Sequence, residues 1–229
     1  FFVDEQQNSG KSQFINKVNN AIDNLRDSTI DKMEEVLFDD GTSDDSKAFD
    51  GLQNLLADTA TTGTVGGINR ATYPWSRHNV DNATGRNMTT TLRPNMLSMW
   101  NNCGKITGGK RQFPDILMTT QTVHEEYENQ LTAITHIPIS DRKVADLGFG
   151  DITYKGAMLV WSPQCPAYHM YFLNTEVLRL LFDKRFFMKL GDWRPIEGTP
   201  LDRVAHTMTV GNLVSGCPKK CGVIYNIGA

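Results

Sequence analysis

The stretch SQFINKVNNAIDNLRDSTIDKMEEVLF, residues 12–38, contains neither proline nor glycine and is typical of one long amphipathic helix. Its apolar side chains recur mostly at intervals of three and four, which places them on one helical face. They are Phe14, Ile15, Val18, Ala21, Ile22, Leu25, Ile30, Met33, Val36 and Leu37. At about 1.5 Å per residue the helix would span about 40 Å, which is long for a chain of 229 residues. We therefore expect it to be the backbone of the fold, with this stripe buried.

The outer face of the same helix carries acidic residues at every fourth position, namely Asp23, Asp27, Asp31 and Glu35. Like charges at this spacing destabilise an isolated helix by roughly a few tenths of a kcal/mol each. Two interpretations are open for this acidic strip. It is a solvated face, or it meets basic groups on a neighbouring molecule or repels a packed polyanion.

Composition excludes several classes of protein. The chain is 39% hydrophobic and 21% charged, as in ordinary globular proteins, and it has no apolar run long enough to span a membrane. Residues 1–58 contain 13 acidic and 5 basic residues, whereas residues 59–229 contain 13 acidic and 18 basic residues. A generally basic nucleic-acid coat is therefore excluded, but one mildly basic face is allowed. Opposite charges on the two parts favour head-to-tail contact between copies.

A phosphate-binding loop is suggested by Gly10, Lys11 and Ser12, which match the end of the pattern G-x-x-x-x-G-K-[ST]. The position of the first glycine holds Glu5, whose carboxylate would oppose a polyphosphate. The alternative is a helix cap, in which Asn8 or Ser9 accepts hydrogen bonds from the first turn. We favour the cap and predict no nucleotide cofactor.

Three other patterns are candidates for chemistry. HEEYE, residues 124–128, resembles a zinc-protease motif but has Glu128 where the second histidine belongs, and an exposed charged helix face explains it as well. CPKKC, residues 217–221, has no second ligand pair that would complete a zinc site. KRFFMK, residues 184–189, fits either a nucleic-acid platform or buried phenylalanines flanked by solvated lysines. No nucleophile, base and orienting group come together, so we predict no catalytic residue, no cofactor, no metal and no enzyme activity.

The rest of the chain predicts an α+β fold, with helices early, antiparallel strands late and no repeated βαβ unit. We expect a short helix after Gly51 and further helices at 87–103, 122–131 and 175–183. We expect strands near 64–68 and 116–119 and within 146–163 and 167–174. Two more strands are expected in 205–227, on either side of a turn at 217–220.

Taken in order, these segments resemble the major capsid proteins of tailed bacteriophages, which share the Hong Kong 97-type fold. Residues 12–38 look like the spine helix of that family. The most specific part is FDGLQNLLAD followed by TVGGINRATYPWSRHNVDN. Its residues match the family signature GL … VGGI … W at Gly51, Leu52, Gly66, Gly67, Ile68 and Trp75. We expect Gly66→Val to strain the backbone and Trp75→Ala to leave a cavity in the core.

The resemblance implies a peripheral (P) domain of residues 1–61 and 205–229 and an axial (A) domain of residues 62–204. It implies a structural subunit of an icosahedral head shell around double-stranded DNA, built from hexamers and pentamers of the chain. Packaged DNA, bound non-specifically, and scaffold, portal or cement proteins would be its partners, with no membrane involved. The protein would be made in the host bacterial cytoplasm and reside in the virion. In this setting Asp23, Asp27, Asp31 and Glu35 become candidate inter-subunit contacts.

One departure from the family pattern is that almost nothing precedes residue 12, where an N-terminal arm and a long β-hairpin, the E-loop, are expected. We expect such a fragment to fold but to be deficient in assembly. Two alternatives are the shell protein of a cellular nanocompartment and a phosphate- or metal-dependent enzyme.

Overall fold

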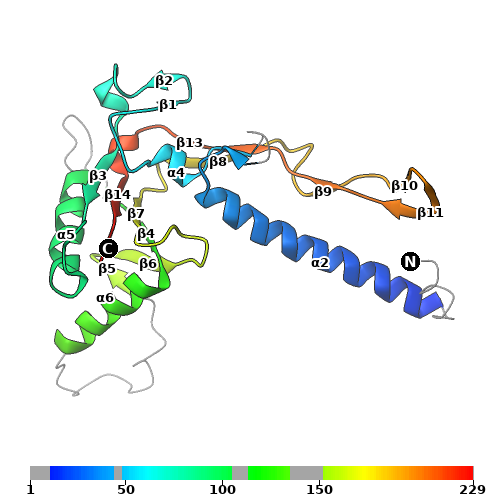
Figure 1. The fold of residues 1–229 in the computed structure, drawn as a ribbon, viewed down its shortest axis with the longest axis horizontal. Helices are drawn as coiled ribbons and strands as arrows, with labels where there is room; N and C mark the ends of the chain where they lie inside the picture. Colours follow the sequence, from blue (N-terminus) through cyan, green and yellow to red (C-terminus); the bar gives the residue numbers. More distant parts are fainter. Residues whose placement is uncertain (1–10, 44–47, 105–112, 135–151, 229) are drawn as a thin grey trace.

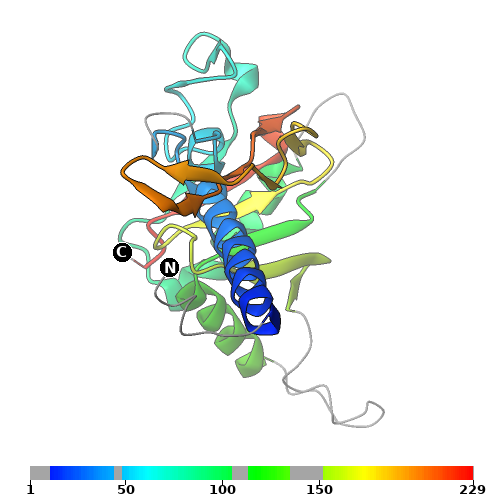
Figure 2. The same cartoon turned by 90° about the vertical axis from the view of Figure 1, so that its right-hand side faces the viewer.

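A computed structural model describes residues 11–43, 48–104, 113–134 and 152–228. The chain forms a sheet-centred body and a long arm (Figure 1). The arm consists of the helix α2, Lys11–Phe38, and an antiparallel ribbon that runs out beside it (Figures 1 and 2). The mixture of helices and strands confirms the predicted α+β class.

The body is built on a six-stranded mixed sheet with the order β3-β14-β7-β4-β6-β5. Within it β3 is parallel to β14 and β4 is parallel to β6, whereas the other neighbours are antiparallel. The bounds of the strands are β3 Asn79–Asn82, β4 Ile116–Thr119, β5 Thr153–Tyr154, β6 Ala157–Trp161, β7 Met170–Leu173 and β14 Gly222–Tyr225. The predicted strands at 116–119, 146–163 and 167–174 are thus confirmed within the described residues, and β3 was not predicted.

Two helices cover one face of this sheet, α5 (Met88–Cys103) and α6 (Gln121–Ile134), both close to their predicted bounds. The Asn87 side chain caps α5 by accepting a hydrogen bond from Thr89 N at 2.9 Å. Side chains alternate along β7, so Met170 and Phe172 pack toward these helices while Tyr171 and Leu173 face the other side.

The second face of the sheet holds a separate core around the end of α2 and the short helix α4, Leu52–Leu55. Phe38, Leu52 and Leu55 are buried there, and Phe38 packs against Tyr171 with ring centroids 6.1 Å apart. Ser162 Oγ also donates a hydrogen bond to Glu34 Oε1 at 2.5 Å, which ties α2 to the loop after β6. These contacts fix the point at which the arm leaves the body.

The ribbon pairs three strand couples in succession, β8 with β13, β9 with β12 and β10 with β11. The bounds of its strands are β8 Leu178–Phe182, β9 Lys189–Leu190, β10 Arg194–Ile196, β11 Thr199–Val204, β12 Thr207–Met208 and β13 Gly211–Ser215. The helix predicted at 175–183 is therefore wrong, because this stretch forms β8. Its leucines favour a helix locally. Instead, its backbone N–H and C=O groups form hydrogen bonds with β13, which lies about 30 residues away in sequence.

Smaller elements complete the described chain. Strands β1 (Thr64–Val65) and β2 (Ile68–Asn69) form a hairpin, and one-turn 3-10 helices lie at Pro74–Ser76 and Pro218–Lys220. The first of these helices and the hairpin belong to a projecting segment, residues 59–78, which we call the hairpin lobe (Figure 1). No helix in the described residues is long and apolar enough to cross a membrane.

The helix α2 runs without a break from Lys11 to Phe38, as predicted. Its apolar stripe, however, is not buried as predicted. Among the stripe residues whose side chains are described, only Val36 is fully buried, and Ile30 is 56% exposed. The stripe reaches the core only in the last turn, because most of α2 extends beyond the sheet (Figure 1).

Two buried basic side chains hold the hairpin lobe on the body. Arg70 is only 2% exposed, and its Nη2 donates to Asn54 O at 3.1 Å and also to Leu55 O, the last carbonyls of α4. His78 is 4% exposed, with Nε2 2.6 Å from Ala57 O. Since a carbonyl only accepts, Nε2 carries the proton, and Nδ1 is buried without a partner among the described residues.

Gly51 permits the close contact between α4 and the end of α2. A Cβ atom at this position would lie 2.6 Å from Val36 O and 2.8 Å from Leu37 O, and even closer to Asp39 O. These are backbone atoms that cannot rotate away. We expect Gly51→Ala to lower the free energy of unfolding by about 2–3 kcal/mol, measured by urea denaturation. The control Gly216→Ala, whose added Cβ would meet nothing closer than 3.9 Å, should cost much less.

The stability of the fold should depend on pH through His78. The pKa of His78 is lowered from 6.5 to about 4, chiefly by burial and to a smaller extent by the charge of Arg70, while the hydrogen bond to Ala57 and the charge of Asp58 oppose the shift. The unfolded chain binds a proton between these pH values while the folded chain does not, so stability falls as pH drops from 6.5 toward 4. The shift corresponds to about 3 kcal/mol. His78→Gln should flatten the pH dependence of the unfolding free energy by about this amount, and an unchanged slope would contradict the assignment.

Candidate functional site

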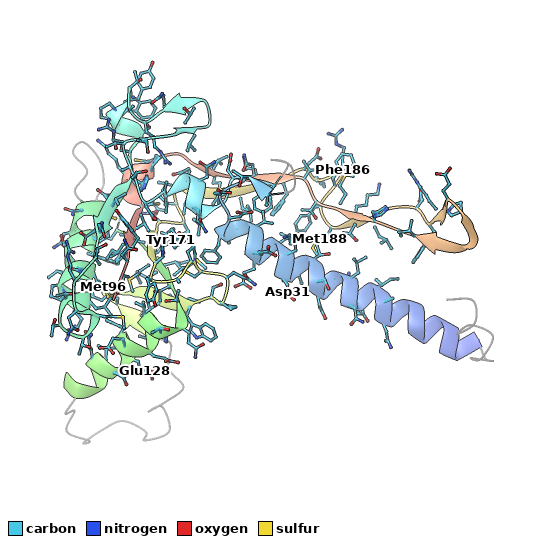
Figure 3. All side chains as sticks on the ribbon, in the orientation of Figure 1. Asp31, Met96, Glu128, Tyr171, Phe186 and Met188 are labelled. Carbon is cyan, nitrogen blue, oxygen red and sulfur yellow. The ribbon has the colours of Figure 1, made fainter. Side chains whose placement is uncertain are left out.

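The acidic strip lies on the part of α2 that is clear of the sheet body (Figure 3). Asp23, Asp27, Asp31 and Glu35 are all exposed. Glu35 pairs with Lys32 at 2.9 Å. Within the described part of the chain, none of the three aspartates has an ion pair. The strip therefore presents uncompensated negative charge next to a half-exposed apolar stripe.

The ribbon beside α2 exposes a set of large apolar side chains. They are Leu180, Leu181, Phe186, Phe187, Trp193, Met208, Val210 and Val214. Exposed apolar side chains that gather on one element are candidates for contacts with a partner. The stripe of α2 and the ribbon are therefore the candidate interaction surface of the arm.

The pattern KRFFMK lies in this ribbon, between β8 and β9. The interpretation with buried phenylalanines is wrong, since Phe187 is 46% exposed although its ring centroid lies 4.7 Å from that of Phe182. Arg185 pairs with Asp183 at 2.8 Å and lies over the Phe186 ring at 5.6 Å. Because Arg185 is neutralised in this way, the basic character of the segment rests on its exposed lysines, which weakens the nucleic-acid interpretation.

The signature residues occupy two separate places. Gly51 and Leu52 are buried at the junction of α2 and α4. Gly66 and Gly67 form the two-residue turn between β1 and β2, with φ of 56° and 79°. Both φ values are positive, which defines a type I′ hairpin turn and explains two glycines in a row. Ile68 follows them and is half-buried.

Trp75 is the one signature residue whose expected environment was wrong. We expected a core side chain whose removal leaves a cavity, but the indole is 58% exposed on the hairpin lobe. It pairs with Tyr73, with ring centroids 6.2 Å apart. The sequence gives no signal for this, because an aromatic residue in a loop is equally compatible with either environment.

The described residues bring together no group of histidine, cysteine and carboxylate side chains that could hold a metal. Of HEEYE, Tyr127 faces the core while Glu128 is exposed. Burial raises the pKa of the Cys221 thiol to about 11 and that of Cys165 to about 12, so neither is a thiolate at neutral pH. Gly10 lies outside the described residues, and Lys11 and Ser12 begin α2.

A histidine–carboxylate pair joins the body to the start of the hairpin lobe. His169 Nε2 lies 3.0 Å from Asp58 Oδ1, and His169 Nδ1 lies 2.7 Å from Ala167 O. The ring is stacked between Tyr171 and Tyr225. Since both nitrogens already face acceptors, the pair offers no free base for catalysis.

The strands β12 and β13 lie within the stretch 205–227 that was predicted to form strands. Their pairing with β9 and β8, which forms the ribbon, was not predicted, and neither was the burial of Arg70 and His78. No local signal marks Arg70 or His78 as buried. Arg70 binds backbone carbonyls of α4, and His78 binds the carbonyl of Ala57.

The arrangement is that of an α+β body with an extended arm, and the described residues hold no group of side chains that could bind a metal. The structure is similar to that of the cyanophage A-1(L) capsid asymmetric unit, with a TM-score of 0.63 and 21% sequence identity, over 93% of this chain and 70% of that chain. It is also similar to the holo-SrpI encapsulin complex from Synechococcus elongatus PCC 7942, with a TM-score of 0.50 and 14% identity, over 89% of this chain and 64% of that chain.

These two similarities establish the fold. The chain has the Hong Kong 97-type capsid fold, which confirms the resemblance drawn from its sequence. No family model matches the chain, and no curated protein matches it either.

Substitutions in the glycine turn and at the exposed tryptophan should lower the free energy of unfolding by different amounts. We expect Gly66→Val to cost about 1–2 kcal/mol, because a β-branched residue is strained at positive φ. An added Cβ at this position would meet no other atom, so the cost comes from the backbone alone. Trp75→Ala should cost less than about 1 kcal/mol. Thermal melting of both variants tests this order, and a greater loss in Trp75→Ala would contradict it.

Proposed function

We propose that the chain is the structural subunit of an icosahedral bacteriophage head shell that encloses double-stranded DNA. The observation that carries the proposal is the similarity to a phage capsid subunit over 93% of the chain. The subunit acts through its surfaces rather than through catalysis.

The exposed arm supports a role in assembly. A shell repeats the same contacts by symmetry, so each subunit must offer surfaces that only neighbouring copies cover. The half-exposed stripe of α2 and the apolar side chains of the ribbon are such surfaces. Left open to water, they would favour non-specific association, so a specific partner surface is the better explanation.

Charge complementarity suggests how two copies meet. The acidic strip carries Asp23, Asp27, Asp31 and Glu35, whereas the ribbon exposes Arg179, Lys184, Lys189 and Arg194. Opposite potentials orient neighbouring subunits and exclude wrong registers. We therefore propose that the strip of one copy faces a basic surface of the next.

The division into a P domain of residues 1–61 and 205–229 and an A domain of residues 62–204 stays a prediction. The ribbon, residues 178–215, spans its boundary at 204/205. Hexamers and pentamers of the chain, packaged DNA, and scaffold, portal or cement proteins stay proposed partners. The proposed location is the virion, after synthesis in the bacterial cytoplasm.

A second candidate function is the shell of a cellular nanocompartment, which the similarity to the encapsulin complex favours. The material that copurifies with particles separates the two functions. Phage heads would contain DNA, which a nuclease degrades only after the particles have been opened. A nanocompartment would contain a protein cargo instead.

An enzyme that uses phosphate or a metal was the third possibility. Thermal melting with ATP and magnesium, and separately with zinc, tests it cheaply, because a ligand present at 100 times its dissociation constant stabilises the folded state by about 2.7 kcal/mol. We expect no shift in either case. A clear shift would argue against a purely structural role.

Charge reversal on the strip tests the proposed contact. We expect the double variant Asp27→Lys/Asp31→Lys of the full-length protein to lower the fraction of chain in shells or oligomers by about tenfold or more, because like charges then meet at the interface. Sedimentation velocity measures this fraction, and circular dichroism should show unchanged melting. Glu125→Lys, a matched reversal on α6, should assemble normally. Equal assembly of the double variant and wild type would contradict the contact.

A further inference from the structure

The strand β13 has one paired edge and one open edge. Asp183 N donates to Val210 O at 2.9 Å, and Gly216 N donates to Val177 O at 2.9 Å. Hydrogen-bonded positions alternate along an antiparallel strand. The even-numbered residues of β13 therefore turn their N–H and C=O groups to β8, and the odd-numbered residues turn theirs to the opposite edge.

The opposite edge has unsatisfied backbone groups. Leu213 N donates to the side-chain Oδ1 of its neighbour Asn212 at 2.9 Å, as expected for a group that points away from β8. Within the described residues, Leu213 O and the N–H and C=O of Ser215 have no partner. An open strand edge of this kind is a template for another strand.

This edge borders a groove of about 410 Å³ between the ribbon and the hairpin lobe. Residues 212–216 all line the groove, and Gly66, Ile68 and Trp75 line it from the lobe. Side chains of a strand alternate between two faces, so five consecutive residues line one groove only if it runs along the strand edge. The volume is within the range of ligand-binding pockets.

One uncompensated positive charge lines the groove. Arg70 donates through Nη2 to carbonyls of α4, but its Nε and Nη1 have no hydrogen-bond partner in the described part of the chain. No carboxylate there pairs with it either. Asp50, which also lines the groove, already accepts hydrogen bonds from Asn54 at 2.6 Å and from Asn212 at 3.2 Å.

A buried hydroxyl supplies a second, independent sign of a missing partner. Ser215 is one of the residues that line the groove, and its Oγ is buried without a hydrogen bond among the described residues. A buried polar group without a partner destabilises the folded chain. A hydrogen bond from a bound segment to this hydroxyl would offset that cost.

We propose that the groove binds an extended, acidic peptide segment of a partner protein, which adds as a strand to the open edge of β13 and places a carboxylate on Arg70. The outward backbone groups of Leu213 and Ser215 are two residues apart. A ligand that satisfies both must repeat hydrogen-bond donors and acceptors at the spacing of a β-strand, and a peptide has this repeat whereas a small anion does not. The exposed Trp75 and Val214 at the groove offer contacts for an apolar side chain of the segment. The inference does not depend on shell assembly.

A fluorescein-labelled heptapeptide, Val-Thr-Val-Asp-Val-Thr-Lys with blocked ends, is the probe. We expect fluorescence anisotropy to show saturable binding to the full chain at or below millimolar peptide. Replacing the aspartate of the peptide with asparagine should weaken binding by about tenfold, as should Arg70→Gln, because both remove a charge-assisted bond. Arg93→Gln, a matched charge removal on α5, should bind normally.

The strand edge is tested separately by Ser215→Pro. Proline removes the outward N–H of residue 215 but leaves the bonds from β13 to β8, so the fold is kept while peptide binding falls at least about fivefold. Arg70 also binds the end of α4, so Arg70→Gln can unfold the chain. In that case the loss of peptide binding in Ser215→Pro still tests the proposal.

Three outcomes overturn the proposal. One is the absence of saturable binding to the wild-type chain. Another is equal binding of the peptide by wild type and Ser215→Pro. The last is self-association of the wild-type chain that Ser215→Pro abolishes, measured by sedimentation without peptide, which would make a second copy the occupant.

Discussion

The end of α2 and the start of α4 lie so close together that only a residue without a Cβ atom fits at position 51. This contact sets the angle at which α2 leaves the sheet. It also brings Phe38, Leu52 and Leu55 into one core with Tyr171 and Leu213. Each such side chain, when buried, contributes about 1.5–3 kcal/mol. The body and the arm are therefore joined by a small core whose packing depends on one glycine.

The arm explains why the chain exposes so much apolar surface. Most of α2 and of the ribbon extend beyond the sheet, so one copy of the chain does not cover their apolar side chains (Figure 1). The body, in contrast, has helices on one face of the sheet and the junction core on the other. This division suits the proposed role as a shell subunit, in which copies associate after each has folded. In that role the acidic strip and the exposed basic residues of the ribbon would orient contacts that apolar area alone leaves unspecific.

The hairpin lobe is held by buried polar groups in addition to the packing of Val65 against the core around α4. Arg70 and His78 bind backbone carbonyls of α4 and of Ala57, and Asp58 meets His169. Such bonds fix the position of the lobe while leaving its outer side chains free for contacts. They also leave Arg70 partly unpaired beside the open edge of β13. The lobe and the ribbon thus enclose a groove whose polar groups are unsatisfied in the isolated chain.

The sequence alone determined the long helix, the helix α5 and the α+β class, because each follows from local periodicity and the order of the elements. It placed a strand near 64–68, where Gly66 and Gly67 instead form the turn between β1 and β2. It also supported the fold family through the order of Gly51, Leu52, Gly66, Gly67, Ile68 and Trp75. It could not decide that 178–182 is a strand, because its partner β13 lies far away in sequence, nor that Trp75 and the stripe of α2 are exposed. Burial is a property of what the rest of the chain covers. For the same reason only the tertiary structure placed Arg70, Ser215 and the open edge of β13 in one groove.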